Sequence, residues 1–335
     1  MPVNQAWLDL LHEEVIDPAL PICDPHHHLW DHPQSRYLLE DLLLDTGSGH
    51  NVRETVFVEC TSMYRKDASE AMKPVGETEF VQGIAAQSAS GQYGETRVAA
   101  AITSFANLSL GAAVEPVLEA HRAASVNRFR GIRHNCGWDE SPRIRKSHTD
   151  PPKDLYLDAQ FRDGLACLGK HHIVFESFLY HTQLLQLADL ARSYPDVSII
   201  LNHVGGPLGI GPYAGKRDEV FQIWSKGIDE LAACPNIVVK LGGISMPING
   251  FGWHKRETPP GSEELARVTA PYILYCIEKF GPARCMFESN FPVDKVSCSY
   301  TVLWNSFKRI VKDFSADEKA DMFRNTALRA YSIEV

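Results

Sequence analysis

The chain has 335 residues, of which 44% are hydrophobic, and its formal net charge is −9. This length suits one large α/β barrel, a class that often exceeds ~250 residues. No run of Lys and Arg exceeds two residues and none alternates with aromatic residues, so the sequence argues against a nucleic-acid partner.

Short apolar runs alternate along the chain with longer amphipathic stretches, a pattern typical of repeated βα units and a parallel sheet. In chain order, the predicted strands are 20–28, 54–60, 97–105, 129–134, 173–180, 197–203, 237–243 and 284–290. The predicted helices are 76–90, 112–124, 158–169, 183–194, 219–233, 263–280, 300–314 and 316–331. We therefore expect residues 1–335 to form a single (β/α)8 TIM-like barrel with extra C-terminal helices.

An open, doubly wound sheet is the competing fold, but no GxGxxG follows a predicted strand. The glycine-rich stretch 205–211 lacks P-loop spacing and is interpreted as an active-site loop. Two long connections, 30–52 and 245–261, follow the first and seventh strands. Both should lie at the carboxyl ends of the strands, where barrels place their chemistry.

Eight cysteines are scattered without a CxxC pair, which favours a reducing compartment over a disulfide framework. The first twenty residues carry acids and resemble no signal peptide. No stretch approaches ~18 uncharged apolar residues, so no membrane span is expected. These observations predict a cytoplasmic protein.

Asp24, His26 and His28 alternate along the first predicted strand and should share one face, which points into the barrel mouth. Two neighbouring imidazoles form a metal-binding pair, or a pair of donors around a reacting oxygen. The alternative is a polar strand exit with solvated histidines.

The segment ICDPHHHLW at 22–30 resembles the DxHxHxW signature of the amidohydrolase-2 group. Later segments are similar to that group in the same order. They are RGIRH at 130–134, LNHVGGP at 201–207, VKLGG at 239–243 and MFESNFP at 286–292. The resemblance covers about 21–331 and implies a TIM-like barrel and hydrolysis, often of lactones, with decarboxylases in a neighbouring branch.

The resemblance also implies that His203 supplies a third imidazole, which ligates a metal or polarises a carbonyl. A core histidine is the alternative. Two positions depart from the group: Asn202 stands where an aspartate is common, and Asn290 replaces the aspartate that acts as general base or metal ligand. An amide cannot take a proton from water near neutral pH, so the usual mechanism is in doubt.

Another group could replace the missing aspartate. The carboxylate candidates are Glu59, Asp294 and Glu288, and the histidine candidates are His181 and His203. Alternatively, Asn290 only orients substrate or water. We favour Glu59 or a histidine, because Glu288 is expected to form a structural ion pair with Lys240 on the adjacent strand.

Other residues are candidates for binding. Arg133 could hold a substrate carboxylate in a bidentate pair, or form an ion pair with a neighbouring strand-end acid. Glu176 lies in an apolar strand and must face a cation or hydrogen-bond donors. His181, Trp138 and Trp253 lie in or beside rim loops and could line the pocket.

The sequence thus predicts a hydrolase of a small cyclic ester, a lactone bearing a carboxylate or an aromatic ring. His26, His28 and His203 would polarise the carbonyl directly or through one divalent metal ion, zinc or manganese. A decarboxylase or hydratase on the same barrel is one alternative, and a non-catalytic ligand-binding barrel is another. The predicted partner is a small-molecule substrate, whose identity the sequence does not give. A homo-oligomer is compatible with the sequence.

Overall fold

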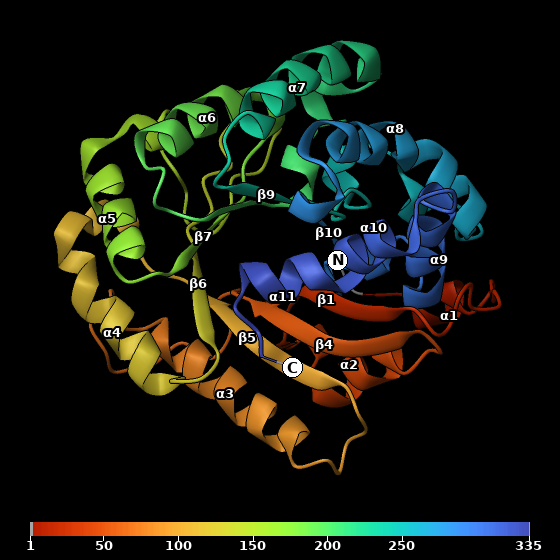
Figure 1. Cartoon of the computed structure of the whole chain (residues 1–335), viewed down its shortest axis with the longest axis horizontal. Coiled ribbons are helices and arrows are strands. Elements are labelled where there is room, and N and C mark those ends of the chain that lie inside the picture. The colour runs from red at the N-terminus through yellow and green to blue at the C-terminus, as the bar shows by residue number, and fades with distance from the viewer. Residues whose placement is uncertain (1–2, 335) are drawn as a thin grey trace.

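The computed structural model describes residues 3–334. Eight parallel strands form one sheet in the order β1-β4-β5-β6-β7-β8-β9-β10. Their bounds are β1 Pro21–His27, β4 Asn51–Val58, β5 Arg97–Ser104, β6 Phe129–Arg133, β7 Val174–Ser177, β8 Ile199–Leu201, β9 Ile237–Leu241 and β10 Cys285–Phe287. Helices surround this sheet (Figure 1). The predicted barrel is confirmed.

The barrel closes where β10 returns to β1, and this seam lies at the carboxyl ends of the two strands. It consists of a single parallel bridge between His27 and Phe291. The backbone N–H of His28 donates to the carbonyl of Phe291 at 2.8 Å, and that of Asn290 donates to the carbonyl of His26 at 2.9 Å. The segments that carry the histidine motif and Asn290 therefore hold the barrel together.

The predicted strands extend one to three residues beyond the observed ones at their carboxyl ends. The difference is clearest at β10, which ends at Phe287 although residues to 290 were included. Beyond the ladder the chain turns sharply, and Asn290 has a φ of 55°. These last residues have left the sheet, so their side chains no longer follow its alternation.

The outer helices agree closely with the prediction. They are α3 Val75–Ala89, α4 Glu115–Ala124, α5 Ala159–Lys170, α6 Leu184–Ser193, α7 Arg217–Ala232 and α8 Ser262–Phe280. The second begins later than expected, because residues Leu108–Val114 form a 3-10 helix interrupted at Gly111, where φ is 58°. Outside the barrel, α1 (Gln5–Leu8) lies near the N-terminus.

Two regions differ from the sequence interpretation. The connection 30–52 contains a hairpin of β2 (Trp30–His32) and β3 (Ser35–Tyr37), followed by α2 (Leu39–Thr46). After β10, α9 (Tyr300–Ile310) is followed by a segment predicted as one helix. That segment is divided into α10 (Ala316–Ala320), a π-helical turn (Asp321–Asn325) and α11 (Thr326–Ala330).

The C-terminal segment closes one end of the barrel. Figure 1 shows α11 lying across the strands. Ala327, Tyr331 and Ile333 pack in one apolar cluster with interior strand residues. The strand members of that cluster include Cys23, Val56, Ala101, Ile200 and Met286. This end of the interior is thus a packed core, as expected for a barrel of this size.

Each of the eight cysteines is free, which agrees with the absence of a predicted disulfide framework. Over residues 3–334, the structure contains no helix with the length and apolar character that a membrane span requires.

Candidate active site

Three side chains meet at the carboxyl end of the barrel, and we call them the site triangle: His26, His203 and Glu288. Oε1 of Glu288 accepts hydrogen bonds from Nδ1 of His203 at 2.7 Å and from the backbone N–H of His203 at 3.2 Å. Oε2 of Glu288 lies 2.7 Å from Nδ1 of His26. All three side chains are buried, so a carboxylate lies between two imidazoles and away from solvent.

The turns after β8 and β9 make this close approach possible. His203 and Val204 follow β8 with φ values of 53° and 46°, which turn the imidazole toward the barrel axis. A Cβ atom on Gly243 would lie 1.9 Å from Nδ1 of His203, and one on Gly242 would lie 2.2 Å from the carbonyl oxygen of Glu288. The GG pair after β9 therefore leaves the space that the site triangle occupies.

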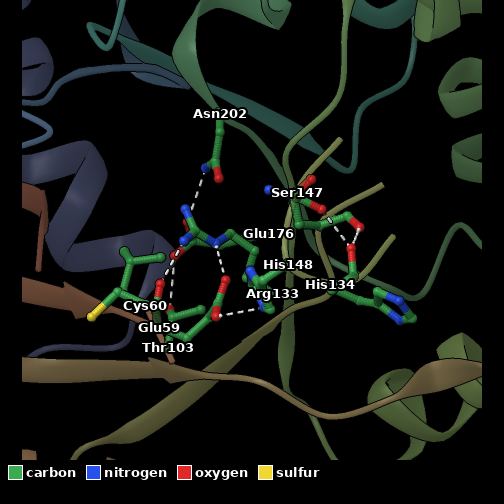
Figure 2. Close-up of polar contacts among 12 residues, drawn as sticks. Glu59, Cys60, Thr103, Arg133, His134, Ser147, His148, Glu176 and Asn202 are labelled. Carbon is green, nitrogen blue, oxygen red and sulfur yellow. Dashed lines mark hydrogen bonds and ion pairs between the residues drawn. The ribbon is translucent and has the colours of Figure 1, made fainter. Parts of the chain in front are cut away.

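Arg133 ends β6 and contacts the site triangle from one side. Its Nη1 lies 3.3 Å from Nε2 of His26, and its Nε donates to Oε1 of Glu59 at 2.8 Å. Figure 2 shows this pair, with His148 on the same carboxylate, where Nε2 lies 3.3 Å from Oε2 of Glu59. Burial alone would lower the pKa of Arg133, but Glu59 and Glu176 raise it overall. The ion pair that the sequence left open is present, and substrate anchoring by Arg133 stays a prediction.

One side-chain level deeper lies a second group, which we call the polar layer: Thr103, Glu176, Asn202 and Lys240. Lys240 Nζ donates to Oε2 of Glu176 at 2.7 Å. It also lies 3.2 Å from Nδ1 of His26. Thr103 and Asn202 donate to Glu176 at 2.7 and 2.9 Å. Burial would raise the pKa of Glu176, but Lys240 and these hydrogen bonds lower it overall.

The expected ion pair between Lys240 and Glu288 is wrong. Lys240 pairs in register with Met286, two residues before Glu288, so the two side chains lie at different depths. The ammonium group instead meets Glu176 across the barrel. The expectation that Glu176 faces a cation and donors is confirmed.

His28 lies beside the site triangle but is directed partly away from it. Its Nδ1 donates to the carbonyl of Val58 at 2.7 Å, and its ring centroid lies 5.0 Å from that of His26 in an edge-on arrangement. His27 points to the other face, where Nε2 contacts Thr55 at 2.9 Å. Burial lowers the pKa of His26 and His28 well below the usual value and that of His27 to about 3. Burial therefore favours the neutral form of each of these rings.

Asn290 belongs to a separate pair. Its amide Nδ2 donates to Oδ1 of Asp294 at 3.1 Å, and Oδ2 of Asp294 accepts from the backbone N–H of Ser245 at 3.1 Å. Burial raises the pKa of Asp294 well above its usual value. The amide thus partners an acid in the turn after β10, while Glu288, two residues earlier, reaches the two histidines.

The other predicted binding residues lie in rim loops. The His181 ring packs edge-on against Tyr213 with centroids 4.9 Å apart. Trp138 lies beneath Lys153, whose Nζ is 5.7 Å from the ring centroid. Trp253 stacks on Phe251 at 4.4 Å and belongs to the main hydrophobic core. Their roles in binding stay predictions.

Sequence reasoning missed two contributors. His148 lies in the long connection after β6, where no periodic pattern predicts which side chain turns inward. Phe178 packs edge-on against His203, with centroids 5.4 Å apart, and adjoins the apolar cluster around Tyr180 and Leu208. The position of this aromatic residue just beyond β7 was the signal that could have identified it.

The site triangle fits a divalent metal ion. One ligand atom from each of its three residues lies within 4.8 Å of the other two. Two imidazoles and one carboxylate form a donor set that catalytic zinc sites use. Oε2 of Glu288 and Nδ1 of His26 face each other at 2.7 Å, so two of the candidate ligand atoms are already side by side. His28, a predicted ligand, lies outside this group of three.

Comparison with known proteins places this geometry in context. The amidohydrolase family model matches residues 23–333. The chain is 24% identical to an L-fucono-1,5-lactonase from Burkholderia multivorans over 322 residues, covering 92% of this chain and 95% of the relative.

Two solved structures share the fold. A zinc-bound amidohydrolase from Burkholderia multivorans superposes with a TM-score of 0.71 at 22% identity, covering 93% of this chain and 99% of that one. A 5-carboxyvanillate decarboxylase from Sphingomonas paucimobilis superposes with a TM-score of 0.56 at 13% identity, covering 94% of this chain and all of that one. At these identities the likeness establishes the fold alone.

Proposed function

Since the chain belongs to the amidohydrolase family, whose model matches residues 23–333, we propose that it hydrolyses a small, neutral, hydroxyl-rich lactone with Glu288 as the essential carboxylate. The observation that carries this proposal is the position of Glu288. Its Oε1 accepts from Nδ1 of His203, and its Oε2 lies 2.7 Å from Nδ1 of His26, so the carboxylate is held between two imidazoles. A general base requires a carboxylate in such a rigid setting.

The chain's own residues support ring opening as follows. Oε2 of Glu288 accepts a proton from water as the water oxygen attacks the lactone carbonyl. The ester C–O bond then breaks, and the proton passes to the departing alkoxide oxygen. Arg133, whose Nη1 lies 3.3 Å from Nε2 of His26, supplies a fixed cation beside the site to stabilise the developing negative charge. A divalent metal ion bound through the imidazoles of His26 and His203 would add Lewis-acid polarisation of the carbonyl and leave Glu288 as the base.

The charges around the site favour a neutral substrate over the carboxylated lactone expected from the sequence. Both nearby cations already have partners, since Arg133 is paired with Glu59 and Lys240 with Glu176. A substrate carboxylate would have to compete with these buried pairs.

A buried hydrogen-bond acceptor near the site also favours a neutral, hydroxyl-rich substrate. Oδ1 of Asn202, the residue before His203, is buried and without a hydrogen-bond partner within residues 3–334. A buried acceptor favours a ligand that brings a donor, because an unmade hydrogen bond is costly. Hydroxyl groups on a sugar-acid lactone are such donors. The relative from Burkholderia multivorans is named as an L-fucono-1,5-lactonase, which agrees with this class.

The test is a substrate panel on the purified protein with and without added zinc. We expect ring opening of neutral aldonolactones, which is detected as the production of acid. An aromatic lactone that bears carboxylates should react at least about tenfold more slowly. Carbon dioxide release from an aromatic carboxylate, without lactone hydrolysis, would instead identify a decarboxylase. Lactone binding without turnover under both metal conditions would identify a non-catalytic barrel.

A further inference from the structure

The polar layer crosses the barrel between alternate strands. Thr103 lies on β5, Glu176 on β7 and Lys240 on β9, and all three are fully buried. In barrels of this class, side chains from alternate strands fill one interior level, and those levels are usually apolar. A charged level beneath His26 is therefore unusual, and its buried charges need hydrogen-bond partners from the surrounding interior.

That support includes a residue from the far end of the chain. Tyr331 follows α11, and its hydroxyl donates to Oε1 of Glu176 at 2.6 Å. Its ring lies 5.6 Å from Nζ of Lys240, and the side chain is fully buried. Two further hydrogen bonds hold the C-terminal segment around Tyr331. The N–H of Ile333 donates to the carbonyl of Leu328, and Arg97 donates to the carbonyl of Glu334.

Glu176 is the junction through which this anchor reaches the site. Oε1 accepts from Thr103 and Tyr331, and Oε2 accepts from Asn202 and Lys240. Lys240 continues to His26 at 3.2 Å, and Asn202 directly precedes His203 in the chain. The orientation of one buried carboxylate thus bears on two members of the site triangle.

We propose that Tyr331 is a positioning residue for the site: the C-terminal segment fixes the Glu176 carboxylate and, through Lys240 and Asn202, the rings of His26 and His203. The catalytic part of this inference rests on the proposed function. Without the hydroxyl, Oε1 of Glu176 keeps one donor, Thr103, and the carboxylate gains freedom to rotate. A packing role alone would need only the ring of Tyr331.

The variant that separates these roles is Tyr331→Phe, which keeps the ring and removes the hydroxyl. Tyr156→Phe is the matched control. Tyr156 is equally buried, and within residues 3–334 its hydroxyl bonds the side chain of Ser177 at 2.7 Å and not the Glu176 carboxylate or the site triangle. For Tyr331→Phe we expect kcat to fall about tenfold with KM within about twofold, since a hydrogen bond to a charged group has an effect of this order. The control should keep its kcat while losing similar thermal stability.

A second readout does not depend on turnover. In protein labelled with 15N-histidine, the ring nitrogen signals of His26, assigned with a His26→Gln sample, should shift in Tyr331→Phe and stay in place in Tyr156→Phe. If no lactone is hydrolysed by the parent protein, the proposed function fails while this spectrum still tests the positioning role. Unchanged His26 signals in Tyr331→Phe, or equal changes in both variants, would overturn the inference.

Discussion

The barrel interior holds two groups built around buried carboxylates, and their surroundings differ. In the polar layer, Glu176 accepts four hydrogen bonds, one of them from Lys240, so both of its oxygens are occupied. In the site triangle, Glu288 lies between two imidazoles, with Oε1 bonded to His203 and Oε2 2.7 Å from Nδ1 of His26. Burial is the same in both cases. The two carboxylates therefore differ in their partners: a lysine and three neutral donors hold Glu176, whereas imidazoles flank Glu288, the carboxylate that we propose to be reactive.

The variant Lys240→Met removes the cation from the polar layer and tests whether the buried Glu176 depends on it. Leaving a buried charge without its partner typically costs about 3–5 kcal/mol. We expect a loss of this order in the free energy of unfolding, measured by urea denaturation. The control is Lys170→Met, which removes a surface pair with Glu115 whose lysine is 66% exposed and which should change the free energy of unfolding little. Similar losses in the two variants would contradict the supporting role of Lys240.

A second variant disturbs the site triangle while its three side chains are kept. In Gly243→Ala, the added methyl group would lie 1.9 Å from Nδ1 of His203 and displace the ring. Misplacement of this kind lowers activity by about 10²-fold. Gly281→Ala shares the positive φ, at 77°, but its Cβ would have nothing within 4 Å. Initial rates of lactone hydrolysis should fall only in the first variant, and equal losses would assign the effect to backbone strain.

A third change, Asn290→Asp, restores the aspartate that the resemblance leads one to expect. It would place a carboxylate against Asp294, 3.1 Å from the present amide nitrogen. Losing that hydrogen bond should cost about 1–3 kcal/mol of stability. Activity should not rise, because Glu288 already supplies the site's carboxylate. Gains in both zinc affinity and turnover would contradict this assignment.

A further prediction concerns the pH dependence of stability and His121, an imidazole outside the barrel interior whose two ring nitrogens both have hydrogen-bond partners. His121 bonds Thr78 and the carbonyl of Phe105, and burial lowers its pKa to about 4. The unfolded chain binds a proton near pH 6.5 while the folded chain does not, so stability falls as the pH drops from about 6.5 toward about 4. Between pH 7 and pH 5 we expect about 2 kcal/mol of the total loss to come from His121. His121→Gln should show a correspondingly smaller drop in urea denaturation, and an unchanged drop would exclude this contribution.

Much of the fold follows from local pattern. Apolar runs of strand length and amphipathic helices predicted all eight strands of the barrel. The alternation predicted the place of His26 at its mouth, but the expected shared face of Asp24, His26 and His28 is wrong. The register shifts between Asp24 and His27, and Asp24 accepts a hydrogen bond from Tyr300 on α9 instead. The hairpin at 30–37 was missed because a surface hairpin of such short strands buries little apolar area and leaves no periodic signal.

The site was harder to predict, because its partners meet across the barrel. Lys240 and Glu288 were paired from their presence on adjacent strands. Their depths and the competing partner Glu176 depend on register, which one sequence does not reveal. Glu288 also lies past the end of its strand, where alternation no longer fixes direction. The acid was recognised as a candidate, but its role required the turn geometry of Gly242 and Gly243.

The most direct test compares Glu288→Gln with Glu176→Gln in one series that measures both activity and unfolding. Removing a general base lowers kcat by about 10²–10⁴-fold. We expect this loss for Glu288→Gln with little change in stability. Glu176→Gln should mainly lose stability, because Lys240 would be left without its buried counter-charge, with a smaller fall in kcat through the positioning of His26. Activity that survives in Glu288→Gln, or a purely structural defect in that variant, would contradict the assignment of Glu288 as the reactive carboxylate.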